Sequence, residues 1–109
     1  MKRVFISHPF SRDPRRSICV VARIARAVAL SGDLPLAPHL LLPAFIHEGT
    51  ERPLALRLSM ALVALCEEVR VYGGLSEGVN LEVAQAHRLG IPVVDGETGE
   101  PFAEKKPPR

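Results

Sequence analysis

The chain has 109 residues, which is the length of one domain. Hydrophobic residues make up 47% and charged residues 24%, proportions of a globular protein that exclude a disordered chain. The 14 Lys and Arg against 12 Asp and Glu give a formal net charge of +2, and Trp is absent. Since no basic run is interleaved with aromatic residues, we expect no nucleic-acid partner.

The cysteines and the start of the chain bear on where the protein works. Cys19 and Cys66 lie far apart, each within an apolar helical pattern, which predicts reduced thiols in or near the core. Residues 1–3 lead directly into an apolar strand pattern, so we expect no signal peptide. The longest apolar stretch, residues 54–66, is too short to span a bilayer. We therefore expect a cytoplasmic protein without a membrane partner.

The first half of the chain shows a strand, a helix and a second strand. Val4–Ile6 is a short apolar run typical of a buried strand. The following loop ends at Asp13, a suitable N-cap for a helix that stops at Ser31-Gly32. Leu34–Leu36 predicts a strand at the edge of the sheet, because its proline cannot donate a hydrogen bond. Residues 40–49 predict an irregular connection.

The second half repeats this alternation. Thr50 is the predicted N-cap of a helix that runs to about Cys66. Strand patterns follow at 69–72 and 91–94, and a helix pattern at 79–89 lies between them.

The alternation predicts the fold class. Residues 1–94 are expected to form one α/β domain of the Rossmann or flavodoxin-like type, with about four parallel strands in the order 2-1-3-4 flanked by helices. Residues 95–109 are expected to be a C-terminal tail. Ligands bind such sheets at the carboxyl ends of the strands, where the strand order reverses. That point lies between the loops 7–13 and 73–78.

The helix within residues 54–66 is apolar on nearly all sides. One face is expected to cover the sheet, and the other needs a second cover. We therefore predict a homo-oligomer, a dimer or larger, that forms through this helix.

Glu82 is the candidate catalytic residue. Val79, Val83 and Ala86 mark the buried side of the last helix, and Glu82 lies on that side. Burying a carboxylate there is costly unless it borders an open crevice. The helix N-terminus is expected to keep its pKa low, which suits a nucleophile or a stabiliser of an oxocarbenium-like centre. The alternative is a carboxylate that extends from the edge of the stripe to solvent.

The start of this helix predicts a phosphate site. Ser76 is placed as N-cap, and Gly78 lets a ligand approach the backbone. The amides of Gly78, Val79 and Asn80 are then expected to be free for a phosphate. The alternative is that Ser76 is only a helix cap.

Polar residues after the first two strands are candidates for ligand contact. Ser7, His8 and Arg12 follow the first strand, and His39 follows the second. For the histidines the alternative is an ordinary loop position. His8, His39 and Glu82 include no closely spaced pair of metal ligands, so we expect no metal. No cofactor is indicated.

Two segments resemble a known superfamily. Residues 76–82, Ser-Glu-Gly-Val-Asn-Leu-Glu, followed by Gly-Ile-Pro-Val at 90–93, resemble the signature of the nucleoside 2-deoxyribosyltransferases and their relatives, the 2'-deoxynucleoside 5'-phosphate N-hydrolases. Residues 4–10 and 35–39 resemble a small bacterial and phage branch of that superfamily. The resemblance implies a Rossmann-like domain that cleaves or transfers the N-glycosidic bond of a small nucleoside or nucleotide.

The resemblance also implies roles for residues and an assembly. Glu82 matches the glutamate that attacks the anomeric carbon, and Ser76 and Gly78 match positions that hold the 5'-phosphate. Members of the superfamily commonly form oligomers that share active sites.

One residue of the superfamily pattern is missing. The superfamily usually has an aspartate on the helix before the third strand, and here no carboxylate lies between Glu51 and Glu67. The candidates for its replacement are His8, His39 or another subunit.

Three hypotheses of function follow. The first is an enzyme of N-glycosidic bond chemistry that uses Glu82. The second is a non-catalytic module that binds and senses a nucleotide. The third is a TIR-like domain that cleaves NAD, because residues 4–7 with a glutamate on a downstream helix resemble such domains.

Overall fold

A computed structural model of the protein describes residues 1–10 and 13–102. Within them, four short parallel strands form a sheet in the order β2-β1-β3-β4, which confirms the predicted α/β class and strand order. The strands are β1 (Arg3–Ser7), β2 (Leu34–Leu36), β3 (Glu68–Val71) and β4 (Val93–Asp95). Phe5 of β1 lies between Leu36 of β2 and Val69 of β3.

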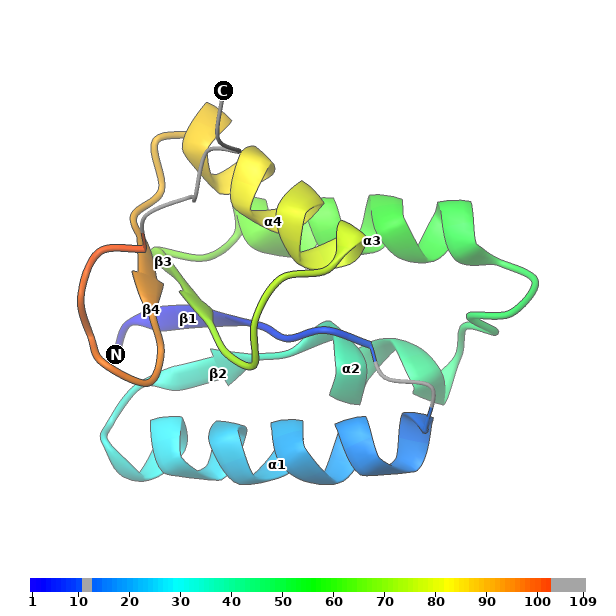
Figure 1. Ribbon diagram of the computed structural model, residues 1–109, viewed down its shortest axis with the longest axis horizontal. Coiled ribbons are helices and arrows are strands. Elements are labelled where there is room, and N and C mark those ends of the chain that lie inside the picture. The colour runs from blue at the N-terminus through cyan, green and yellow to red at the C-terminus, as the bar shows by residue number, and fades with distance from the viewer. Residues whose placement is uncertain (11–12, 103–109) are drawn as a thin grey trace.

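Helices cover both faces of this sheet. α1 (Pro14–Leu30) lies along one face, and α3 (Arg52–Ala64) and α4 (Glu77–Arg88) lie on the other (Figure 1). The short helix α2 (Pro38–Leu41) and the 3-10 turn η1 (Leu42–Ala44) follow β2. Among the described residues, no helix is both long enough and apolar enough to cross a membrane.

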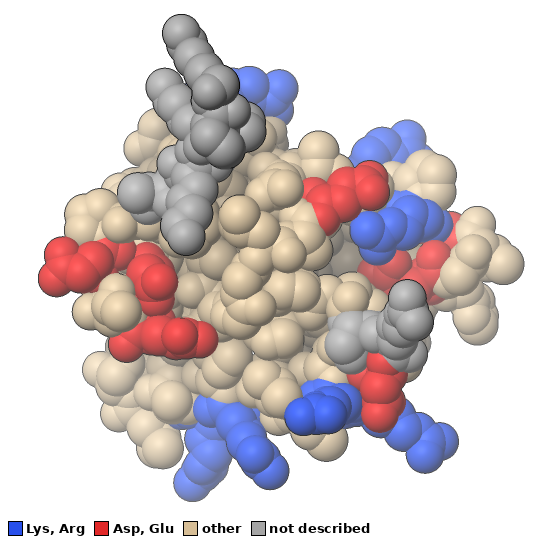
Figure 2. All heavy atoms as spheres, viewed as in Figure 1, with Lys and Arg blue, Asp and Glu red and all other residues tan. Residues whose placement is uncertain are grey.

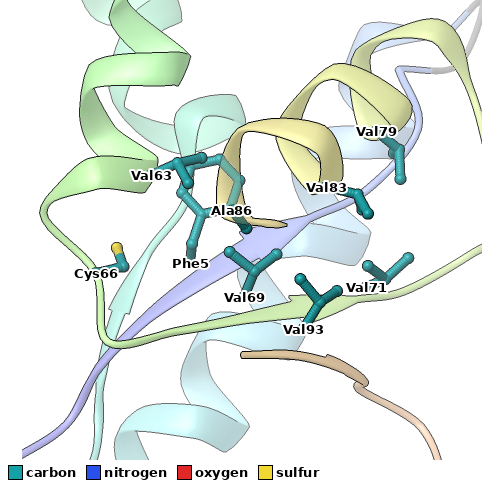
Figure 3. Packing of buried hydrophobic residues seen from close by; sticks show 9 residues of the cluster. All are labelled: Phe5, Val63, Cys66, Val69, Val71, Val79, Val83, Ala86 and Val93. Carbon is teal, nitrogen blue, oxygen red and sulfur yellow. The ribbon is translucent and has the colours of Figure 1, made fainter. Parts of the chain in front are cut away.

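Alternation along β1 divides the core into two clusters. Val4 and Ile6 pack with Val21 and Val28 of α1. Phe5 points to the other side, where it packs with apolar side chains of α3, α4, β3 and β4 (Figure 3). Because side chains alternate along a strand, Ser7 lies on the same side as Phe5 and therefore faces α4.

Several helix boundaries differ from the predictions. Asp13 is the N-cap of α1 as predicted, accepting bonds from two amides of the first turn. The N-cap of α3 is Glu51 instead of Thr50, and the Glu51 side chain accepts a bond from the His47 amide. The predicted irregular connection at 40–49 contains the end of α2 and all of η1, both of which start with proline at an early helical position.

The boundaries of two strands also differ from the predicted ones. β3 begins at Glu68 and ends at Val71, and β4 begins at Val93. The predicted strand start at Ile91 is wrong because its amide donates to the carbonyl of Ala86, which closes the end of α4.

The two cysteines differ in burial. Cys66 is buried, whereas Cys19 is exposed, so the prediction of a thiol in or near the core is wrong for Cys19. The buried positions of α1 are Ser17, Val21 and Val28, and a residue two positions after Ser17 points roughly to the opposite side of a helix. Burial raises the pKa of the Cys66 thiol to about 11.

The solvent face of α1 is basic. Arg15, Arg16, Arg23 and Arg26 are all exposed, and Figure 2 shows Lys and Arg side chains along the edge of the molecule where α1 lies.

On α3, Ala55, Ser59 and Val63 are the buried positions. Most of its remaining apolar side chains are half-buried in a single chain, and the predicted partner subunit stays a prediction.

Candidate functional site

A cavity of about 180 Å³ opens beside the end of β1. Its walls come from the loop after β1, from α2, from α3 between Arg52 and Ser59, and from the first turns of α4. This is the region between the loops after β1 and β3, where the strand order of the sheet reverses. Figure 2 shows acidic and basic side chains next to each other at this end of the molecule.

Glu82 is buried in this cavity. Its side chain is only 6% exposed, and the hydroxyl of Ser7 donates a hydrogen bond of 2.6 Å to Glu82 Oε1. Ser7 is the last residue of β1 and is itself completely buried. The carboxyl group therefore lines the cavity beside the sheet, and the alternative in which it extends to solvent is wrong.

The pKa of Glu82 is raised to about 7. Burial is the main cause, and the hydrogen bond from Ser7 and the charge of Arg52 offset part of it. The expected low pKa is therefore wrong. The electrostatic effect of a helix N-terminus falls off within the first turn, and Glu82 lies six residues after the N-cap Ser76. Near neutral pH this group exists in both forms, as a general acid or base requires.

The start of α4 has fewer backbone amides without a hydrogen bond than predicted. Ser76 caps the helix, and its hydroxyl accepts a bond from the amide of Val79. The amide of Asn80 donates to the Ser76 carbonyl. These two amides are therefore already bonded, so the prediction that they are free for a phosphate is wrong. The amides of Glu77 and Gly78 have no acceptor among the described residues, and both residues line the cavity.

Arg52 supplies a cation that the sequence did not indicate. It is the first residue of α3 and lines the cavity. Its Nη2 lies 3.9 Å from the position that a Cβ on Gly78 would occupy, and its Nη1 lies 3.2 Å from Glu48 Oε2. The spacing of the Glu48–Arg52 pair is visible in the sequence, but its position beside α4 depends on the fold. The predicted cation, Arg12, lies outside the described residues.

Three aromatic rings form another part of the wall. The ring of His39 is stacked on Phe10, with centroids 4.8 Å apart and planes 21° apart. The ring of His8 lies edge-on to the ring of His39, with centroids 6.0 Å apart. His39 is only 5% exposed. Burial, and secondly the neighbouring His8, lower the pKa of His39 to about 4. Gly73 has a φ of +75°, and a Cβ there would lie 2.8 Å from His8 Nε2, so this position requires glycine.

The stretch in which an aspartate was expected contributes an alcohol to the cavity. In the stretch between Glu51 and Glu67, Ser59 of α3 lines the cavity and is buried. His8 and His39, two of the candidates for its replacement, line the same cavity. Among the described residues, no group of three or more His, Cys, Asp or Glu side chains is placed to hold a metal ion.

The arrangement of the sheet and helices is similar to that of a solved enzyme. This is a 2-deoxyribosyltransferase from the psychrotolerant bacterium Bacillus psychrosaccharolyticus, a biocatalyst for the synthesis of nucleosides. The TM-score is 0.63 at 15% identity, and the match covers 93% of this chain and 77% of that one. The protein therefore has a 2-deoxyribosyltransferase-like fold, as the resemblance of its sequence predicted.

A family model matches residues 2–95, so the chain belongs to the family described as domain of unknown function DUF7768. A comparison with curated proteins found no match.

Proposed function

We propose that the protein cleaves or transfers the N-glycosidic bond of 2'-deoxynucleosides or their 5'-monophosphates, with Glu82 as the reacting carboxyl group. The observation that carries this proposal is the buried Glu82 carboxyl, held by Ser7 at 2.6 Å inside the cavity. A 2-deoxyribosyltransferase-like fold supports the class of substrate.

The chemistry needs one carboxylate and one proton. Ionised Glu82 attacks the anomeric carbon, and the bond to the base nitrogen breaks with its electron pair leaving on the base. The base takes up a proton as it leaves. Water then displaces the carboxylate in hydrolysis, or the nitrogen of a second base displaces it in transfer. A pKa of about 7 keeps a share of Glu82 ionised at neutral pH.

The start of α4 and Arg52 are proposed to hold a 5'-phosphate. Helix N-termini attract anions through their unbonded amides, here those of Glu77 and Gly78. The Arg52 guanidinium lies beside Gly78 and adds a full positive charge. This set replaces the originally predicted amides of Val79 and Asn80. Ser76 holds the helix end in place as its N-cap.

The test is release of free base from each deoxynucleoside and each deoxynucleoside monophosphate, measured by chromatography. Glu82→Gln keeps the side-chain size and an acceptor for Ser7 but cannot attack or exchange a proton. We expect it to reduce base release by about 10²-fold or more. The control is Glu97→Gln, which neutralises an exposed carboxylate outside the cavity and is expected to leave the rate nearly unchanged. Equal rates in Glu82→Gln and the wild type would refute the proposal.

A second candidate function is nucleotide binding without catalysis. It is favoured by the part of the cavity wall that α3 supplies, which contains the alcohol Ser59 and no carboxylate. In that case a nucleotide at a hundred times its Kd would stabilise the folded protein by about 2.7 kcal/mol. The melting temperature would rise, while no base would be released. NAD in the same assay tests the TIR-like hypothesis, which requires release of nicotinamide.

A further inference from the structure

The two ring nitrogens of His39 are buried, and neither has a hydrogen-bond partner of ordinary geometry within the described part of the chain. This is unusual, since buried polar groups in folded proteins nearly always have a partner. The backbone of Pro9 lies near enough to the ring to offset part of the decrease in its pKa. His39 also lines the cavity that contains Glu82. An unpartnered donor or acceptor at such a place points to a group that is supplied by a bound molecule.

Neighbouring rings hold His39 in one orientation. Phe10 stacks on its face at 4.8 Å, and His8 meets it edge-on at 6.0 Å. The backbone of His39 belongs to α2, which begins with Pro38. Because the ring is packed on its face and along its edge, it cannot turn its nitrogens to bulk water without leaving Phe10.

His39 is uncharged under ordinary conditions, because burial keeps its pKa near 4. A neutral imidazole carries one N–H donor and one acceptor nitrogen. It therefore recognises groups that donate or accept hydrogen bonds, and it carries no positive charge to attract a phosphate. A cation in this cavity is Arg52, the first residue of α3, which lies beside the start of α4.

We propose that His39 is a specificity-determining residue that hydrogen-bonds the edge of the substrate's nucleobase. This inference rests on the proposed function and adds to it the part of the substrate that His39 contacts. Nucleobases carry N–H donors and carbonyl or ring-nitrogen acceptors on one edge, which matches a neutral imidazole. Phe10, the ring that stacks on His39, is 36% exposed, so its side chain has room to rotate aside as the base enters.

The test compares two ligands that differ only in the base. Binding of the best deoxynucleoside monophosphate and of 2-deoxyribose 5-phosphate, which lacks a base, is measured by calorimetry. His39→Phe keeps an aromatic ring against Phe10 and removes both nitrogens. We expect it to weaken binding of the monophosphate about tenfold or more and to leave binding of the base-free sugar phosphate unchanged. The control is His47→Phe, a change at an exposed histidine, which is expected to leave the binding of both ligands unchanged.

Other outcomes separate the possible failures. An equal loss of affinity for both ligands in His39→Phe would mean a structural role for this ring and would overturn the inference. Unchanged binding of both ligands, with base release still dependent on Glu82, would overturn the inference and leave the proposed function intact. If the wild type bound no deoxynucleoside monophosphate, the proposed function and the inference would fail together.

A measurement on the wild type does not depend on the folding of a variant. The ring nitrogens of histidine have ¹⁵N resonances that shift strongly when a hydrogen bond forms. We expect the His39 resonances to shift with the monophosphate and to stay in place with the base-free sugar phosphate. Identical spectra with the two ligands would contradict contact between His39 and the base.

Discussion

Replacing Glu82 by glutamine should stabilise the protein, and the gain should depend on pH. The pKa of Glu82 rises from 4.5 to about 7 on folding, chiefly because the group is buried. Between these values the unfolded chain releases a proton that the folded chain keeps, so the free energy of unfolding falls as the pH rises. The loss is complete above pH 7 and amounts to about 3 kcal/mol, since each unit of pKa corresponds to about 1.4 kcal/mol.

Glutamine has nearly the same shape, carries no charge and still offers an oxygen to the Ser7 hydroxyl. We therefore expect Glu82→Gln to raise the free energy of unfolding by about 3 kcal/mol at pH 8 and by about 1 kcal/mol at pH 5. Denaturant titrations of both proteins at the two pH values measure this. A difference between the proteins that is the same at pH 5 and pH 8 would refute the assignment of a raised pKa to Glu82.

The free energies of unfolding of the two proteins must be compared at each pH, because His39 gives stability the opposite pH dependence. Its pKa falls from 6.5 to about 4 on folding. Between these values the unfolded chain takes up a proton that the folded chain does not, so this residue makes stability increase with pH. In the wild type, the contributions of Glu82 and His39 to the pH dependence of the free energy of unfolding largely cancel. The difference between wild type and Glu82→Gln removes the contribution of His39 and isolates that of Glu82.

Two further changes test the packing around the site and the sheet. Ser7→Ala removes the hydrogen bond that lowers the pKa of Glu82, so the pH profile of base release, or the ¹³C resonance of the Glu82 carboxyl, should move to higher pH; an unmoved profile would contradict this. Gly96→Ala would place a Cβ 2.3 Å from the ring of Tyr72, and we expect the free energy of unfolding to fall by about 1–3 kcal/mol. Gly49→Ala, where nothing lies within 4 Å of the added Cβ, is the control and should unfold at nearly the wild-type denaturant concentration.

Much of the fold could be predicted because the relevant signals are local. Alternating strand and helix patterns, together with right-handed crossovers, leave few possible topologies, and the observed order β2-β1-β3-β4 is the predicted one. Helical spacing placed Glu82 on the buried side of its helix, and the structure confirms that side. Asp13 could be predicted as a cap because its bonds reach only the next few residues.

The remaining features depend on contacts between distant segments. α2 has four residues, too few to show a helical period. Arg52 reaches the site only because α3 packs beside α4. The raised pKa of Glu82 depends on the depth of its burial, which no spacing of residues in a sequence measures. The apolar neighbours of Cys19 in the sequence indicate a buried side chain, but its position on α1 leaves it exposed.

The hydroxyl that holds the Glu82 carboxyl belongs to an inner strand of the sheet. The backbone of Ser7 pairs with β3, and its carbonyl accepts a bond from the amide of Tyr72 at 2.9 Å. The rings of Phe10 and His39, in contrast, come from a loop and a four-residue helix. A lineage could therefore exchange the loop and α2 while Glu82 kept its place, so that the aromatic wall of the cavity and its buried carboxyl group would be free to evolve separately.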